Sequence, residues 1–264
     1  LTCIVCKILE SFVRDAIMEH FTKNKLFSNR QYGFRKGRST QLQLLAVLDD
    51  WTKALQSGGQ IDAIYTDFEK AFDKVPHKRL IKKLKAYGLN DQLIYWIRGF
   101  LMDRRQRVRV NGKYSEWKSV LSGIPQGTIL GPPLFIIYIN DLPREVDIFA
   151  DISLYADDAK LYKHIKDTDD VKELQLALDQ LTSWCERWHL SLNAKKCKIL
   201  TVSRRTILDS SYGIKKGNNL EYLEKVDKIK DIGVLMDSKL NFTDHIAETT
   251  NKAYSMIGII KRNF

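Results

Sequence analysis

Two neighbouring aspartates, Asp157 and Asp158, stand between two short apolar runs. This pattern predicts a strand, a tight turn and a returning strand, with both carboxylates at the tip. Like charges placed side by side repel each other, and a divalent cation shared with a third carboxylate would remove that repulsion. Magnesium suits such a site because it takes oxygen ligands, often one or two carboxylates together with substrate phosphates. A solvated turn is the alternative, because aspartate is common in turns.

A further aspartate, Asp67, ends the alternating run 61–67. Alternation of apolar and polar residues predicts a strand there. Capping of a following helix is the alternative role for an aspartate at a strand end. Phe72 lies five residues beyond Asp67, and two helices are predicted over 77–87 and 91–102.

A cationic loop, 31–40, precedes a helical pattern of leucines from Leu42 to Leu55. Ser39 or Thr40 can cap that helix. A basic, glycine-containing loop at a helix N-terminus is suited to phosphate groups, whereas a solvated loop is the alternative. Its cations are Arg35, Lys36 and Arg38.

Residues 104–120 predict a hairpin that turns at Asn111-Gly112, the strongest short hairpin signal. Arg105, Arg107 and Arg109 fall on one face because side chains alternate along a strand. Such a row suits a phosphate backbone, and a solvated strand face is the alternative.

The remaining segments alternate between loops and amphipathic patterns. A Gly/Pro-rich loop, 122–133, carries Gln126 and Gly127, where a glycine allows close backbone approach to a ligand. Helical spacing of apolar residues predicts further helices, and short apolar runs predict strands. The predicted helices cover 3–21, the apolar segment after 131, 171–188 and 242–260; a strand covers 199–202, loops and short strands 204–221, and a short hairpin 230–237.

Composition favours a large globular chain with a polyanionic partner. The 264 residues include 44% hydrophobic residues and carry a formal net charge of +11. The longest central apolar run, 134–139, is too short to span a bilayer, so no membrane is expected. Cys3 and Cys6 are predicted to be buried thiols rather than zinc ligands. The chain opens without Met inside a predicted helix, which indicates a fragment of a longer protein.

An ordered set of motifs resembles the reverse transcriptase domain of non-LTR (LINE-type) retrotransposons. Group II intron and retron enzymes share the loop near Arg35 and the YADD core, whereas the 75–80 and INDLP segments favour the retrotransposon branch. The motifs are, in order, QYGFRKGRST, DFEKAFDKVPHKRL, RRQRVRVNG, SGIPQGTILGP, INDLP, YADD and NAKKCK.

The resemblance implies an α+β fold of the right-hand polymerase type, with fingers, a palm built on an antiparallel sheet, and a partial thumb. Fingers and palm would occupy 1–237, with fingers mainly 1–57, palm mainly 58–203 and the primer grip 226–237. The thumb helix would start within 238–264.

The resemblance also assigns roles to residues. Asp67, Asp157 and Asp158 would be catalytic ligands of two Mg²⁺ ions, for which Mn²⁺ can substitute. Two such ions stabilise both the attacking and the leaving oxygen of an in-line displacement. Lys196 would be the catalytic proton donor, with Lys195 as the alternative. The nucleotide would contact Arg35, Lys36, Arg38, Phe72, Gln126 and Gly127, and primer and template would contact Arg105, Arg107, Arg109, Ile232, Gly233 and Val234.

The expected function is RNA-directed DNA polymerisation, with an RNA template, a DNA primer or target DNA, and dNTPs as partners. An RNA-dependent RNA polymerase is disfavoured because Phe72 replaces the expected polar residue that reads a ribose. The main alternative is an inactive retrotransposon-derived fragment that only binds nucleic acid. The sequence specifies neither oligomeric state nor compartment, although a nuclear location would suit a eukaryotic element.

Overall fold

The computed structural model describes residues 3–204, 208–217 and 219–263. Its centre is a five-stranded sheet in the order β11-β8-β1-β7-β6, antiparallel except for the β11–β8 pair. The strands are β1 (Gln60–Thr66), β6 (Asp151–Tyr155), β7 (Asp158–Ile165), β8 (Lys198–Ser203) and β11 (Glu224–Val226).

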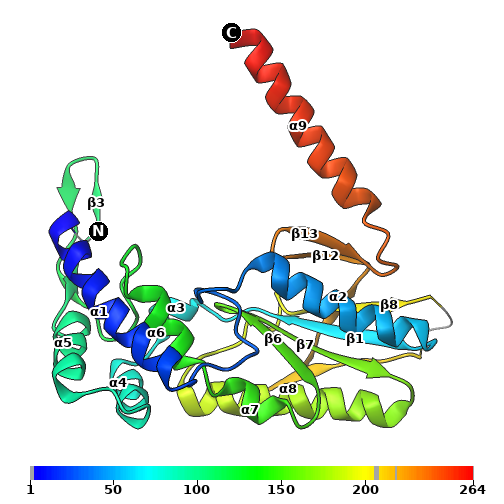
Figure 1. Ribbon diagram of the computed structural model, residues 1–264, viewed down its shortest axis with the longest axis horizontal. Helices are drawn as coiled ribbons and strands as arrows, with labels where there is room; N and C mark the ends of the chain where they lie inside the picture. Colours follow the sequence, from blue (N-terminus) through cyan, green and yellow to red (C-terminus); the bar gives the residue numbers. More distant parts are fainter. Residues whose placement is uncertain (1–2, 205–207, 218, 264) are drawn as a thin grey trace.

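Helices cover both faces of this sheet (Figure 1). Helix α2 lies on one face, and α7 and α8 lie on the other. Strand β1 is therefore buried on both sides, with Ile61 and Ala63 packing in one apolar cluster and Ile64 in the other. The covering helices are α2 (Thr40–Gln56), α7 (Leu142–Val146) and α8 (Thr168–Trp188).

A second, mainly helical part packs beside the sheet and shares its larger core. Helix α6 is buried along its length because all of its residues except Pro132 lie in the interior. The helices of this part are α1 (Ile4–Lys23), α3 (Ala71–Lys74), α4 (His77–Ala86), α5 (Asp91–Leu101) and α6 (Gly131–Tyr138).

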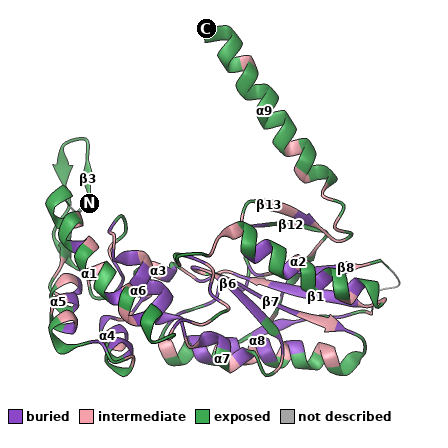
Figure 2. Ribbon diagram, viewed as in Figure 1, coloured by how far each residue is buried: buried purple, intermediate pink, exposed green. Residues whose placement is uncertain are grey.

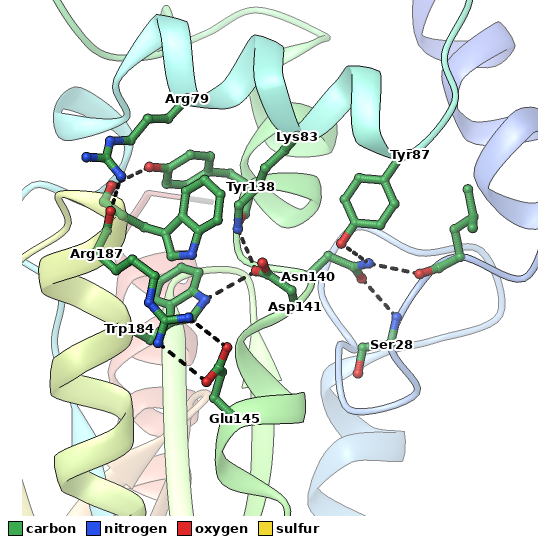
Figure 3. A network of polar contacts seen from close by, with 12 residues as sticks. Ser28, Arg79, Lys83, Tyr87, Tyr138, Asn140, Asp141, Glu145, Trp184 and Arg187 are labelled. Atoms are coloured by element: carbon green, nitrogen blue, oxygen red, sulfur yellow. Dashed lines mark hydrogen bonds and ion pairs between the residues drawn. The ribbon is translucent and has the colours of Figure 1, made fainter.

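A polar network joins the two parts around the buried amine of Lys83 (Figure 3). The amine donates to the Asp141 carboxylate and the Tyr138 carbonyl, and lies 3.7 Å from the ring centroid of Trp188. The Trp184 indole N–H donates to the same carboxylate at 3.3 Å. The network therefore links α4 to α8 through the segment after α6.

Small hairpins and one long helix project from this body. Helix α9 (Thr243–Asn263) extends away from the sheet and has no buried residue (Figures 1 and 2). The hairpin strands are β2 (Arg105–Gln106), β3 (Arg109–Val110), β4 (Lys113–Tyr114), β5 (Lys118–Ser119), β9 (Gly213–Lys216), β10 (Asn219–Tyr222), β12 (Lys228–Asp231) and β13 (Val234–Asp237).

The α+β prediction is confirmed, as are the helices and hairpins expected from sequence. Of the predicted segment 204–221, positions 205–207 and 218 lie outside the described residues. The prediction that Cys3 and Cys6 are buried is wrong, because both are exposed at the start of α1. Among the residues that the structure describes, no helix combines the length and apolar character that a bilayer span requires.

Candidate active site

The three aspartates meet at one edge of the central sheet. Ala156 and Asp157 form the turn between β6 and β7, and Asp158 is the first residue of β7. In the register of β1 with β7, Thr66 lies opposite Ala159, so the next residue of the chain, Asp67, lies beside Asp158. Two chain segments far apart in sequence thus bring their carboxylates together.

The electrostatics of this edge reflect crowded negative charge. Burial, followed by the charge of Asp67, raises the pKa of the Asp157 carboxyl. Burial, followed by the charge of Asp157, raises the pKa of Asp158 to about 6. The negative charge around Asp157 and Asp158 therefore adds to burial in raising their pKa values, and a cation at this edge would offset that repulsion.

The donor set fits hard divalent ions, because it consists of carboxylate oxygens at adjacent strand ends. Within the described part of the chain, no three His, Cys, Asp or Glu side chains already converge as a metal-binding cluster.

Lys196 is the lysine that reaches this edge. Its amine lies 3.6 Å from an Asp67 carboxylate oxygen, and both Lys195 and Lys196 are exposed. The loop that carries Lys196 is fastened to the Asp67 backbone, because the Asn193 N–H donates to the Asp67 carbonyl at 2.8 Å. Of the two candidate lysines, the geometry favours Lys196.

A small pocket of about 170 Å³ opens beside the aspartates. Asp67, Asp158 and Lys196 line it, together with Ile232 from the turn of the β12–β13 hairpin. Gly233 and Val234 follow Ile232, and Gly233 has a φ of +95° that suits glycine. The predicted primer-grip turn thus begins at the pocket wall.

Three residues that dock this hairpin are not predicted from the sequence. Asp231 is buried and accepts hydrogen bonds from the amine of Lys160 and, at 3.1 Å, from the hydroxyl of Tyr65. Burial lowers the pKa of Lys160, although Asp231 opposes that shift. A buried lysine in β7 and an aspartate in the predicted hairpin 230–237 gave no local signal of their pairing, because the pairing depends on tertiary structure.

Phe72 and Gln126 come from segments that are hydrogen-bonded together. The Ile124 N–H donates to the Phe72 carbonyl at 2.8 Å, and the Gln126 amide donates to Asp73 at 3.1 Å. The Phe72 ring is half-buried and stacks on Phe135, with ring centroids 4.4 Å apart. Gln126 and Gly127 are exposed on the loop above α6.

The cations of the 31–40 loop are not equally available. Arg35 is half-buried and donates to the carbonyls of Ser28 at 2.6 Å and Gln31 at 3.2 Å. Arg38 lies over the Tyr32 ring at 4.7 Å, and Lys36 is exposed. Ser39 caps α2, as predicted.

The arginine hairpin lies apart from the aspartate edge. Figure 1 shows β3 beside the N-terminal end of α1, at the same end of the molecule as α5, whereas β6 and β7 meet near its centre. Arg105, Arg107 and Arg109 are all exposed. The three arginines predicted to contact the template thus lie apart from the aspartates predicted to be catalytic.

The sheet is mainly antiparallel, helices cover both of its faces (Figure 1), and three aspartates lie at one edge. This arrangement is that of the palm of a right-hand polymerase. The chain belongs to the family described as reverse transcriptase (RNA-dependent DNA polymerase), whose model matches residues 1–238. Members of this family generally use divalent metal ions and bind RNA templates.

Curated relatives agree with this placement. The chain is 30% identical over 261 residues to the probable RNA-directed DNA polymerase from transposon BS of Drosophila melanogaster, covering 94% of the chain and 28% of that protein. It is 31% identical over 249 residues to the polymerase from the mobile element jockey of the same species, covering 91% and 26%. The chain thus spans about a quarter of the length of these relatives.

Telomerase structures share the fold. Apo telomerase from Candida tropicalis, truncated from its C-terminal domain, matches with a TM-score of 0.60 at 13% identity, covering 88% of this chain and 44% of that one. Candida albicans telomerase, solved with a TWJ fragment of telomeric RNA, also matches with a TM-score of 0.60 at 13% identity, covering 87% and 37%.

Proposed function

We propose that this chain is the polymerase domain of a non-LTR retrotransposon protein and extends a primer with dNTPs on an RNA template. The observation that carries the proposal is the meeting of Asp67, Asp157 and Asp158 at one sheet edge, with the Lys196 amine 3.6 Å from Asp67. Membership of the reverse transcriptase family supports this chemistry.

The three aspartates would hold two Mg²⁺ ions, for which Mn²⁺ can substitute. Such ions activate the attacking 3′-hydroxyl and stabilise the leaving pyrophosphate oxygen. Asp67 and Asp157 would hold the ions, and Asp158 would complete the negative field. Lys196 would donate a proton to the leaving group, since its amine is already held beside Asp67.

The nucleotide side would be built from two segments. Phe72, Gln126 and Gly127 would line the sugar and base. Lys36 and Arg38 would hold the triphosphate. Arg35 keeps the same predicted role, but its guanidinium first has to leave the two carbonyls that it binds.

Domain boundaries and the nucleic-acid path follow from the same proposal. We assign the fingers mainly to 1–57, the palm mainly to 58–203, the primer grip to 226–237 and the start of the thumb to 238–264. Ile232, Gly233 and Val234 would contact the primer end, because their turn begins at the pocket beside the aspartates.

The test is primer extension on an RNA template by the Asp157→Asn variant. Loss of one carboxylate should abolish extension while leaving the melting temperature unchanged or higher, because it also removes repulsion. Asp169→Asn is the matched control, because Asp169 is exposed beyond the opposite end of β7. Extension by Asp157→Asn at the parental rate would refute the metal assignment.

The alternative function is nucleic-acid binding without catalysis. The observation that favours it is the exposed row of arginines on the 104–120 hairpin, which can bind phosphates without a metal ion. A parental chain that binds a primer–template but does not extend it with either Mg²⁺ or Mn²⁺ would support this alternative.

A further inference from the structure

The 104–120 hairpin interleaves arginines with aromatic rings on one face. The Arg107 guanidinium carbon lies 3.8 Å from the ring centroid of Tyr114 and 4.5 Å from that of Trp117. Arg105 lies over Trp117 at 5.8 Å, and Arg109 lies over Tyr114 at 5.4 Å. The three cations and two rings therefore form one continuous surface, which we call the Arg–aromatic face.

This face is positioned for a ligand rather than for the core. Tyr114 and Trp117 remain 51% and 52% exposed. Within the described residues, the guanidinium groups of Arg105, Arg107 and Arg109 form no hydrogen bond or ion pair. Stacking occupies only the faces of the guanidinium planes. The N–H groups at the edges of these planes therefore remain available to donate hydrogen bonds to a ligand.

Charge on the whole hairpin has one dominant sign. Residues 104–120 contain six Lys or Arg residues and one acidic residue, Glu116. A cationic strand face with exposed rings matches the two features of a nucleic acid strand, its phosphates and its base faces.

The base of the hairpin is joined to the loop that carries Gln126. The Arg104 guanidinium donates to the Gly123 carbonyl at 2.8 Å, and the Val120 N–H donates to the Arg104 carbonyl at 2.8 Å. A groove of about 310 Å³ runs between Gln106 and Gln126 at this junction. A nucleic acid strand that passes the loop carrying Gln126 would therefore reach the 104–120 hairpin next.

We propose that the Arg–aromatic face binds the single-stranded RNA template, with bases stacked on the exposed parts of the Tyr114 and Trp117 rings that the guanidinium groups leave open, and phosphates on the arginines. A single strand fits because its base faces are free, whereas in a duplex each base face is covered by its stacked neighbours. The assignment of the strand as template rests on the proposed function, and the binding chemistry rests on the hairpin itself.

Binding is measured with the Asp157→Asn chain, so that no extension can occur. The probe is a short fluorescein-labelled oligouridine, compared with an RNA duplex of the same length by fluorescence anisotropy. Tyr114→Leu/Trp117→Leu keeps apolar bulk but removes both aromatic faces, and should weaken oligouridine binding by about 5- to 100-fold. Duplex binding should stay within about twofold, because it depends on charge.

Val108→Thr/Val110→Thr is the matched control, because both valines are exposed on the opposite side of the same hairpin. Equal losses on oligouridine and duplex, or an equal loss in the control, would overturn the proposal. Tighter binding of a single-stranded DNA of the same length than of oligouridine would overturn the RNA assignment. Because binding is scored without extension, an inactive parental chain would refute the proposed function and leave this result intact.

The phosphate contacts have a separate signature. Arg107→Ala should make the dependence of binding on salt shallower, by about 0.7 in the log–log slope for a single strand. An unchanged slope would place Arg107 outside the contact and contradict the proposed face.

Discussion

The backbone N–H of Ala156 donates a hydrogen bond to the side-chain carbonyl of Gln31 at 3.0 Å. The same oxygen accepts from the Gly33 N–H at 2.7 Å, and the Tyr32 N–H donates to the Leu154 carbonyl at 2.8 Å. Ala156 has a φ of +54° and directly precedes Asp157. The cationic loop is therefore fastened to the aspartate turn, and Gln31 stabilises the turn's unusual backbone.

This contact predicts that Gly33→Ala impairs catalysis. A Cβ at Gly33 would lie 2.5 Å from the Ala156 nitrogen, a backbone atom that can yield only if the aspartate turn moves. Displacement of reacting groups by about 1 Å can cost about 100-fold in rate, so kcat for primer extension should fall about 10- to 100-fold. Steady-state extension kinetics measure this change.

Gly99→Ala is the control for that experiment. A Cβ at Gly99 meets nothing within 4 Å, and the residue is exposed in α5. Alanine there should leave kcat unchanged and stabilise the helix by up to about 1 kcal/mol. Equal kcat values for Gly33→Ala and the parental chain would show that the turn tolerates the displacement.

The buried amine of Lys83 predicts a pH dependence of stability. Burial lowers the pKa of Lys83 to about 8, below its ordinary 10.5, although Asp141 opposes that shift. Between these two values the unfolded chain binds more protons than the folded chain. The contribution of Lys83 to the free energy of unfolding should therefore rise from pH 8 to pH 10.5, by up to roughly 3 kcal/mol.

Comparison with Lys83→Met isolates this contribution, because other titrating groups are common to both chains. The difference in unfolding free energy, parental minus variant, should increase across that window in urea titrations. A difference that is flat with pH would mean that Lys83 keeps an ordinary pKa inside the network of Figure 3.

Local patterns predicted the elements that carry the candidate site. Alternation placed Asp67 at the end of β1, and the Asn111-Gly112 pair placed the hairpin turn, because both signals depend on neighbouring residues. Gln31 gave no such signal, since its partner Ala156 lies 125 positions away. Polar pairs that form only after the sheet assembles are invisible to periodicity.

The incorrect prediction for Cys3 and Cys6 has a similar cause. The apolar stripe predicted for 3–21 is buried only toward the C-terminal half of α1, where Ile17 and Phe21 are fully buried. Ile4 at its N-terminal half is 79% exposed. The spacing of residues along a helix predicts which face is apolar. How much of that face is buried depends on the other elements that pack against it.

Removal of the tyrosine hydroxyl that donates to the buried Asp62 carboxylate should lower the stability of the fold. This carboxylate, fully buried in β1, accepts a hydrogen bond from the Tyr212 hydroxyl at 2.7 Å. Tyr212→Phe leaves a buried charge with one donor fewer, which should cost about 1.5–3 kcal/mol. Thermal unfolding should show a clearly lower melting temperature. Tyr222→Phe, at a position 68% exposed, is the control and should change stability by less than about 0.5 kcal/mol.

The last prediction concerns sugar selection by Phe72. Its ring stacks on Phe135 with an interplanar angle of 23°, and it remains half-buried, so one part packs and another stays open. A ribose 2′-hydroxyl against this ring would lose water without gaining a hydrogen-bond partner. Phe72→Val should therefore raise incorporation of ribonucleotides relative to deoxyribonucleotides in single-nucleotide insertion assays.

Phe135→Leu separates that effect from packing. Phe135 is fully buried, so its substitution disturbs the same stack without presenting a smaller side chain to the sugar. It should lower the melting temperature and leave the sugar ratio unchanged. Phe72→Val should cost less than the roughly 3–5 kcal/mol of a fully buried Phe→Ala change, because its ring is only half-buried. A sugar ratio that shifts equally in both variants would mean that the stack, rather than an open face of Phe72, governs selection.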